Sequence, residues 1–340
     1  MIAIFLVVVF LVLLRTLLIE SGTIKPHIKH KHNKIKKKIV SKRFQEIYNY
    51  IESEYAKDLE SNRKKLIKYM IICAILFIIS CLLFLFLVTN LRIHTRLGYK
   101  LIGFICIPII MVGVHSYLKY NKIYKENFKD KIIKNLFKYI NPNLQYDPIG
   151  GNNLHKYYLD AGFKGDFNKF ITDDYIEGCH ENNINLKMAN IALGDNDKTK
   201  FLYEGIFSVT EINQYLQDKV IIKKNKYMFK DNDYKKIGMD SEEFEKYFDV
   251  YSTSSMLAME ILTHDIMEEL VEFYNTYRIE FEIVFKDNHI YIRFDTGVMF
   301  EPNILKKSND LSTIWVYYNV MNFAISLTMR INNVLQEIDI

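Results

Sequence analysis

Two long apolar runs dominate the N-terminal third of the chain, at residues 69–88 and 101–118, and a short polar loop, residues 90–100, joins them. A helix of about 20 residues rises about 30 Å, which matches the thickness of the hydrocarbon core of a bilayer. Because the loop is short, the two runs are expected to form a transmembrane helical hairpin. The segments before and after the hairpin then lie on the same side of the membrane.

Amphipathic stretches continue both helices beyond the apolar runs. Apolar residues recur at spacings of three and four over residues 44–59, before the hairpin, and over residues 120–140, after it. This spacing predicts helices with one apolar stripe each. The two helices are expected to pair into a helical stalk, residues 44–140, that ends before Pro142, since proline disfavours the helical conformation of the residue that precedes it.

The first segment, residues 1–19, is a further candidate for a transmembrane segment. Residues 2–14 are apolar, Arg15 interrupts the run, and residues 16–19 continue it, so its length barely reaches that of a span. A signal peptide would carry its positive charge before the apolar core and a small-residue cleavage site after it, and the segment has neither. Two interpretations stay open: an N-terminal transmembrane segment, which gives three spans, or an interfacial segment beside the hairpin.

A basic juxtamembrane linker, residues 20–43, follows, and its lysines are concentrated within residues 25–43. Lysines also flank the outer ends of the hairpin, whereas the connecting loop carries only Arg92, Arg96 and Lys100. The positive-inside rule favours topology as the reason for this bias, and it predicts a multi-pass protein of the cell membrane with its large C-terminal domain in the cytoplasm. Besides the lipid bilayer itself, anionic lipid headgroups are an expected partner near residues 25–43. Nucleic acid is not an expected partner.

From residue 141 onward the pattern predicts one cytosolic α+β domain, residues 141–340. Alternating apolar positions between turn residues predict strands. The expected strands are 175–179, 184–193, 201–209, 220–227 and 248–252, followed by a hairpin of 279–285 and 290–294 across Lys286-Asp287-Asn288-His289. Helical spacing predicts helices near 256–270 and 311–335. Short turns between successive strands imply an antiparallel sheet, and we expect the helices to cover one of its faces.

Several motifs of this domain occur in order along the chain. They are Tyr146-Asp147-Pro148, Asp173-Asp174-Tyr175-Ile176-Glu177-Gly178, Glu204-Gly205-Ile206-Phe207, residues 244–252 and Phe300-Glu301-Pro302. Together with the preceding hairpin they resemble the bacterial domain-of-unknown-function 3137 family, over roughly residues 40–335. The chain departs from the family in its N-terminal apolar segment and at residues 253–255, where the family more often carries acidic residues.

The resemblance implies a membrane-anchored protein from a family without an established activity, catalytic residues or cofactor. Members of the family are often encoded beside a LemA-type membrane protein. The resemblance therefore also implies a LemA-type protein as a candidate partner.

Short catalytic motifs are absent from the sequence. Gly150-Gly151 lacks the Lys-Ser or Lys-Thr of a phosphate-binding loop, and the chain has no Cys-x-x-Cys pair and no Gly-x-Ser-x-Gly elbow. Cys179 is the one cysteine outside the apolar runs, which excludes a disulfide within the polar domain and agrees with a reducing cytoplasm. The 24 Tyr and 23 Phe accompany abundant Ile, Lys and Asn, which indicates a genome rich in A and T rather than base stacking.

Four groups of residues are candidate sites. They are Cys179 with His180, His264 with Glu260 and Glu268, the pair Asp173-Asp174, and an aromatic groove of Trp315, Tyr317, Tyr318 and Phe323 beside residues 298–300. Neighbours in a strand point to opposite faces, acidic pairs at strand starts are usually turn features, and aromatic clusters usually fill a core. We therefore assign no catalytic, cofactor-binding or metal-binding residue and expect no cofactor.

Three functions of different classes stay open. The first and favoured one is a non-enzymatic, membrane-anchored interaction or scaffold protein whose cytosolic domain binds another protein. The second is a lipid-binding or envelope-stress module with a basic, aromatic-rimmed concavity that faces the bilayer. The third is an enzyme without a short motif, which would show a polar pocket with perturbed carboxylates or histidines. The three spans lack intramembrane acidic residues, so only an oligomer could line a transport pore.

Overall fold

The structure is a computed structural model that describes residues 42–90, 96–163, 167–180, 184–195, 201–225 and 234–337. The predicted N-terminal segment, residues 1–19, and the basic stretch 25–41 lie outside the described residues. Two compact units make up the chain. We call Met1–Ile133 with Glu301–Leu311 the helical unit, and Lys134–Phe300 with Ser312–Ile340 the sheet unit.

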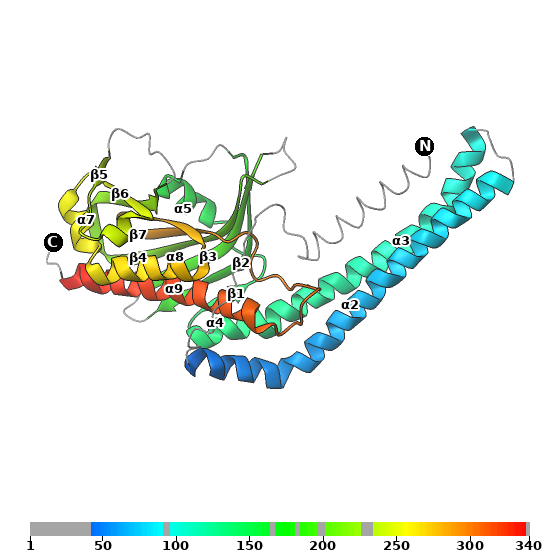
Figure 1. Cartoon of the computed structure of the whole chain (residues 1–340), viewed down its shortest axis with the longest axis horizontal. Helices are drawn as coiled ribbons and strands as arrows, with labels where there is room; N and C mark the ends of the chain where they lie inside the picture. Colours follow the sequence, from blue (N-terminus) through cyan, green and yellow to red (C-terminus); the bar gives the residue numbers. More distant parts are fainter. Residues whose placement is uncertain are drawn as a thin grey trace. The chain divides into compact units, whose positions relative to one another are not determined.

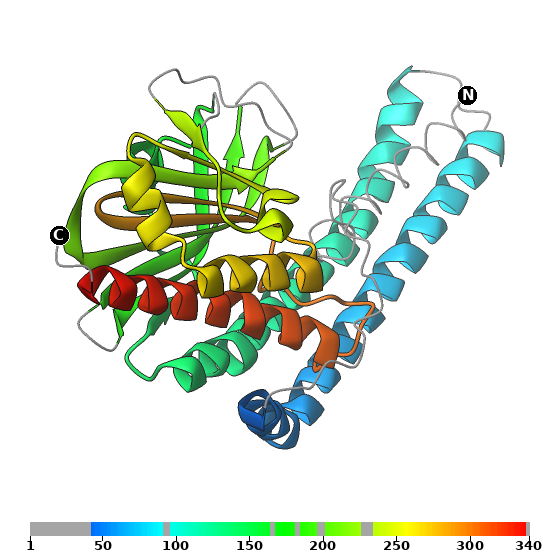
Figure 2. The ribbon, with the colours of Figure 1, turned by 60° about the vertical axis from the view of Figure 1, so that its left-hand side comes forward.

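The helical unit is built on two long helices, α2 (Lys42–Asn90) and α3 (Arg96–Phe128), followed by a π-helical turn, η1 (Lys129–Ile133). Both views of the ribbon show α2 and α3 side by side (Figures 1 and 2). They run antiparallel, because Tyr69 meets Tyr120 whereas Ser80, further along α2, meets the earlier Cys106. The two helices predicted from the 3.6-residue spacing are confirmed.

The sheet unit begins with α4 (Lys134–Ile140), which ends before Pro142 as predicted. Its seven strands are β1 (Gln145–Asp147), β2 (Lys169–His180), β3 (Ile184–Gly194), β4 (Tyr203–Lys224), β5 (Lys235–Ile237), β6 (Phe248–Ser252) and β7 (Glu280–Asp295). The order is β1-β2-β3-β4-β6-β5, and β7 pairs with the other side of β4. All pairings are antiparallel, which confirms the predicted α+β class.

Helices cover both faces of the sheet. On one face, Tyr158 of α5 (Leu154–Ala161) packs on Phe207 of β4. On the other, Phe323 of α9 (Leu311–Glu337) contacts Phe281 and Phe294 of β7, with α8 (His264–Tyr277) beside it (Figure 2). The prediction that helices cover a single face was wrong, because adjacent residues of β4 and β7 are apolar on both faces and both need a cover.

The predicted hairpin across Lys286-Asp287-Asn288-His289 is also wrong. β7 is one strand of 16 residues, and it pairs with β4 from Ile206 opposite Phe294 to Ile222 opposite Ile283. Asp287 has a φ of 55°, and the register shifts along the facing part of β4. Asp and Asn favour turns, but they also occur at irregular positions within a pair of strands, as they do here between β4 and β7. For the same reason, β4 is one strand where two were predicted.

The structure has two helices where the sequence pattern predicted one. The stretch 256–270 divides into α7 (Ser255–Ile261) and α8, which follow α6 (Glu242–Glu245) in the chain. The Ser254 side chain accepts a hydrogen bond from the Leu257 backbone N–H at 3.3 Å and begins α7. Leu262 and Thr263 then interrupt the helical hydrogen bonding, so the apolar spacing passes through a break.

Candidate functional site

An apolar band lies on the α2–α3 pair in the half that is nearer to the connection between the two helices. Within the described residues, one helix, Lys42–Thr89, is long and apolar enough to cross a membrane. Large apolar side chains that are 40–79% exposed lie on both helices: Ile71, Ile75, Ile78, Ile79, Leu82, Leu85 and Phe86 on α2, and Phe104, Ile107, Met111, Val112 and Leu118 on α3. Soluble monomers rarely expose continuous apolar surface of this extent. The band supports membrane association.

Small and polar residues line the contact between the two helices at the level of this band. The Ser80 hydroxyl donates to the Cys106 carbonyl at 3.2 Å, and the Cys106 thiol donates to the Ser80 carbonyl at 3.6 Å. A Cβ atom at Gly113 would lie 3.1 Å from the Cα of Cys73, so the backbones approach closely. Small residues and interhelical hydrogen bonds are typical of helix contacts in membranes.

An aromatic pair marks one end of the apolar band. The rings of Tyr69 and Tyr120 stack at 3.8 Å, and the Tyr69 hydroxyl donates to the Tyr120 hydroxyl at 3.0 Å. Tyrosines gather at the interface between hydrocarbon and water, where the ring is in the apolar layer and the hydroxyl reaches polar groups. Lysines are frequent immediately beyond this pair on both helices.

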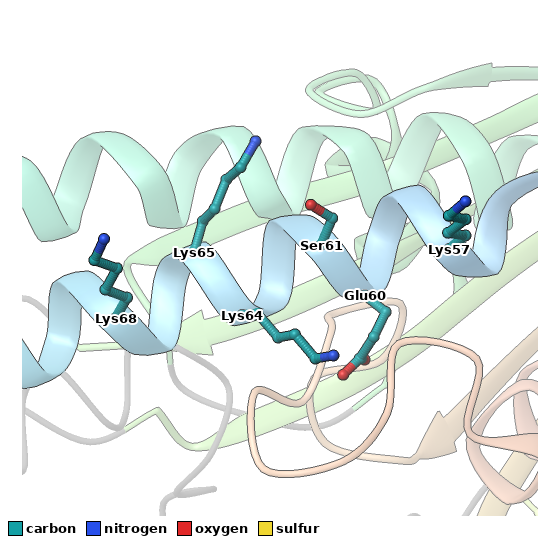
Figure 3. Close-up of a pocket in the computed structure, with 6 residues that line it drawn as sticks. All are labelled: Lys57, Glu60, Ser61, Lys64, Lys65 and Lys68. Carbon is teal, nitrogen blue, oxygen red and sulfur yellow. The ribbon is translucent and has the colours of Figure 1, made fainter.

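A basic groove of about 480 Å³ lies on α2 directly beyond Tyr69, and it is lined by Lys57, Glu60, Ser61, Lys64, Lys65 and Lys68. We call these six residues the α2 groove. Figure 3 shows their side chains projecting from successive turns of the same helix. Helical spacing places the lysines on neighbouring turns, so that their ammonium groups gather along one stretch of the helix. The groove is a concentrated positive charge at the end of the apolar band.

The one carboxylate of the groove is already neutralised. Both carboxylate oxygens of Glu60 accept hydrogen bonds from Arg63, at 2.8 Å from Nε and 2.7 Å from Nη2. The bidentate bond to Arg63 lowers the pKa of Glu60, although partial burial opposes the shift. Glu60 therefore compensates Arg63 and leaves the charge of the four lysines in place.

A segment from the far end of the chain packs on the helices close to this groove. We call Glu301–Leu311 the strap. Arg63 donates from Nη1 to the Ile304 carbonyl at 2.8 Å, and the Tyr124 and Ser308 hydroxyls share a hydrogen bond of 3.2 Å. The Ile304 side chain is buried in a cluster with Leu66, Tyr117 and Tyr124. Nothing in the local sequence pattern of the strap indicated these contacts.

Asp174, a member of the acidic pair Asp173-Asp174, is a buried structural carboxylate. It lies at the irregularity of β2 with a φ of 55°. Its oxygens accept hydrogen bonds from the Tyr146 hydroxyl and, at 3.0 Å, from the Asn190 side-chain amide. The same Asn190 amide also donates to the Met299 carbonyl at 2.9 Å. Asp174 thus joins β1, β2, β3 and the segment after β7, which gives the acidic motif a structural role.

The other candidate groups are spread out by the fold. Cys179 and His180 are consecutive on β2, opposite Asn185 and Ile184 of β3. Glu260 lies in α7, whereas His264 begins α8 after the break, and the two residues do not share one helix face. The metal site considered for Glu260, His264 and Glu268 required one continuous helix, and the helix is interrupted between Glu260 and His264.

The aromatic residues considered for a groove are largely core residues. Tyr317 packs edge-on against Phe300 at 5.2 Å, and Phe323 stacks on Phe273 of α8 at 3.9 Å. Both Tyr317 and Phe323 are buried. The interpretation that these rings fill the space between sheet and helix is confirmed.

A polar cluster on the α5 face of the sheet had no counterpart among the sequence predictions. Asp160, in α5, accepts hydrogen bonds from Lys286 at 2.6 Å and from the Tyr291 hydroxyl at 2.5 Å. Burial alone would raise the pKa of Asp160, but these two hydrogen bonds outweigh it and lower the pKa. His289 stacks on Tyr291 and contacts Tyr157 in a tilted arrangement, with 5.6 Å between ring centroids in each case. The cluster joins residues more than 120 positions apart, and no local spacing could have revealed it.

A second, shallow polar pocket of about 530 Å³ lies near the irregular part of the β4–β7 ladder. It is lined by Asn185, Glu211, Ile212, Asn213, Tyr215 and Asn288. The Glu211 carboxylate accepts hydrogen bonds from the Asn185 and Asn288 amides at 3.2 and 3.3 Å. Glu211, Asn185 and Asn288 thus link three strands, whereas Asn213 and Tyr215 bond to Asn332 and Asp287.

The described residues therefore define an α+β protein with a helix able to cross a membrane. Residues 201–333, from β4 into α9, match the model of a family described as "Protein of unknown function (DUF3137)". This match confirms the resemblance to that family. The comparison with curated proteins found no match.

Among solved structures, the chain is similar to the "crystal structure of the mycobacterial trehalose monomycolate transport factor A, TtfA". The two share 12% sequence identity and a TM-score of 0.29, over 52% of this chain and 86% of that one. A likeness of this level carries no argument about function.

Proposed function

We propose that this chain is a membrane-anchored, non-enzymatic interaction protein. Helices α2 and α3 cross the cell membrane as a hairpin, and the sheet unit lies in the cytoplasm, where it binds another protein. The carrying observation is the change along both helices from exposed apolar side chains to lysines, with Tyr69 and Tyr120 at the boundary. Lysines at this end support a cytoplasmic location by the positive-inside rule.

The internal pairing of charges in the sheet unit supports binding rather than catalysis. Arg293 of β7 pairs with Glu282 at 2.7 Å, and Lys224 of β4 bonds to Glu280 and to the Tyr274 hydroxyl. Asp174 is held by Tyr146 and Asn190, as described above. An enzyme without a short motif would instead need such groups to converge on a substrate-sized cavity.

Helix α7 offers a surface for a protein partner. Met256 and Met259 are 70% and 49% exposed, and their three-residue spacing places them on the same side of the helix. Methionine side chains are flexible and polarisable, and they are frequent on surfaces that bind other proteins. We therefore place the partner-binding surface at α7.

A crosslinked pull-down from native membranes tests this function. The full-length chain is compared with M256K/M259K and with the control L159K, which changes an apolar residue of α5 that is 57% exposed. We expect one protein, with a LemA-type membrane protein as the first candidate, to be recovered with the unmodified chain and with L159K but not with M256K/M259K. Equal recovery from all three, or recovery of none, would contradict the proposal.

Lipid binding is the second candidate function, and the α2 groove favours it. The groove is basic and begins one residue beyond Tyr69, at the boundary of the apolar band. Its basic lining supports this candidate function, although no described aromatic residue lines the groove itself. The two functions are compatible, because the groove lies in the helical unit and α7 lies in the sheet unit.

A further inference from the structure

The geometry points to the α2 groove as a binding site for the phosphate group of an anionic phospholipid. The assignment rests on the proposed crossing of the membrane by α2. It differs from the general attraction between a membrane and the basic stretch 25–43, because it names an open site on one helix with defined lysines. The residues that would contact the lipid phosphate are Lys64, Lys65 and Lys68.

We name these three lysines because of their distance along α2 from the apolar band. At a rise of about 1.5 Å per residue, Lys68 lies roughly 5 Å and Lys64 roughly 10 Å from Ile71, the first strongly exposed residue of the apolar band. The headgroup layer is roughly 5–7 Å thick on each side of the hydrocarbon core, and flexible lysine stems extend toward it. Lys57 lies roughly 20 Å from Ile71 and is beyond the reach of a lipid phosphate.

Three of the four lysines of the groove form no ion pair with another described residue, whereas Lys64 interacts electrostatically with Glu60. Within the part of the chain that the structure describes, Lys57, Lys65 and Lys68 form no ion pair, and all three are exposed. The groove's own carboxylate, Glu60, is held by Arg63. A bound phosphate would therefore gain charge-assisted contacts without breaking an internal pair.

Most lysines at the same level of α3 are paired, although Lys119, beside Tyr120, is exposed and forms no ion pair among the described residues. Lys122 pairs with Glu126 at 3.8 Å, Lys125 and Lys129 pair with Glu301 at 3.0 Å each, and Lys131 pairs with Asp58. Several unpaired lysines thus gather in the α2 groove, whereas α3 presents Lys119 alone beside paired lysines among its described residues. This concentration of unpaired charge favours a ligand at the groove.

The test uses the full-length protein in mild detergent and measures bound lipid by native mass spectrometry. Phosphatidylglycerol and phosphatidylcholine are added in equal amounts. We expect preferential retention of phosphatidylglycerol by the unmodified chain. In K65Q/K68Q the apparent affinity for phosphatidylglycerol should fall about 25-fold, since each lysine near a lipid headgroup contributes about 1 kcal/mol.

Two control variants distinguish a lipid site in the α2 groove from a general attraction between lysines and anions. K57Q removes a lysine of the same groove that a lipid phosphate does not reach, and K122Q/K131Q removes two lysines that are already paired; both should retain phosphatidylglycerol. Equal retention of the two lipids by the unmodified chain, or equal losses in K65Q/K68Q and K122Q/K131Q, would overturn the assignment. Displacement of the lipid by inorganic phosphate together with a loss in K57Q would indicate a site for soluble anions and would also overturn it.

Flotation of cell membranes distinguishes failure of the lipid site from failure of the proposed function. If the unmodified chain does not float with membranes, the proposed membrane anchor is contradicted, and so is the lipid site that depends on it. If the chain floats but shows no preference for phosphatidylglycerol, the lipid site alone is overturned and the anchor stands.

Discussion

The helical unit and the sheet unit differ in how far their apolar and charged side chains are exposed. In the helical unit, Ile78 and Leu82 of α2 are more than half exposed, whereas Phe207 and Tyr291 of the sheet are fully buried. The ion pair between Lys122 and Glu126 lies in solvent, with side chains 78% and 63% exposed, whereas those of Arg293 and Glu282 are only 23% and 18% exposed. The helical unit exposes the apolar side chains of its band, which supports membrane association, whereas the sheet unit buries its apolar side chains in a core.

The largest expected effect comes from placing the same charge on equally exposed residues of the two units. Leu82 of α2 is 60% exposed and Leu159 of α5 is 57% exposed. Leu82→Asp should disfavour membrane insertion by about 3 kcal/mol, because an aspartate near the centre of a spanning helix must enter hydrocarbon. Leu159→Asp should change stability by less than about 0.5 kcal/mol, since its side chain stays in water.

Membrane fractionation and the yield of folded protein measure this contrast. Leu82→Asp should shift the chain from the membrane fraction toward aggregates or degradation, and Leu159→Asp should behave as the unmodified chain does. If both variants fractionate normally and remain folded, water rather than lipid surrounds α2, and the comparison between the units fails.

The second contrast removes one carboxylate from an ion pair in each unit. Glu282→Gln should destabilise the sheet unit by about 2 kcal/mol, because it leaves Arg293 largely enclosed between the rings of Phe163 and Tyr203 without its counter-charge. Glu126→Gln should cost less than about 0.5 kcal/mol, as is usual for exposed pairs.

Urea unfolding of the full-length protein in detergent, followed by tyrosine and tryptophan fluorescence, gives both values. Equal midpoints for Glu282→Gln and the unmodified chain would mean that water reaches Arg293 freely. The charge pairing would then not distinguish the sheet unit from the helical unit.

Local patterns predicted the elements whose signal is contained in a short stretch of sequence. The 3.6-residue spacing predicted α2 and α3, and the strand β6 was predicted at its observed bounds, residues 248–252. The hairpin predicted within β7 failed because Asp287 adopts a left-handed conformation inside a ladder, and the same residue types serve a turn or a bulge. Only the partner strand decides between the two, and the sequence pattern does not contain it.

The family motif at Gly205 shows what a sequence match leaves unexplained. A Cβ atom at this position would collide with the backbone carbonyl of Phe294 on β7, so the close approach of the strands requires glycine. Gly205 is part of the motif Glu204-Gly205-Ile206-Phe207. The residue that makes glycine necessary there, Phe294, lies about 90 positions further along the chain.

The α2 groove is partly visible in the sequence and partly hidden. The lysines before the first apolar run are a topology signal, and their helical spacing follows from the periodicity. The pairing of Glu60 with Arg63 and of the α3 lysines with Glu301 and Asp58 depends on the folded chain. The distinction between committed and uncommitted lysines therefore required the structure.

The smallest expected effect is a pH dependence confined to the sheet unit. Burial between Tyr157 and Tyr291 lowers the pKa of His289, and it outweighs the opposing influence of Glu211, Asp160 and Asp287. With the folded-state pKa below the unfolded value, the unfolded chain binds more protons as the pH falls below about 6.5, so stability is complete above that pH and declines below it.

The loss should be small because His289 is only partly enclosed. Urea midpoints measured between pH 7.5 and 5.5 should fall for the unmodified chain and fall less for His289→Gln. A steeper loss that persists in His289→Gln would assign the pH dependence to another group and would contradict this part of the comparison.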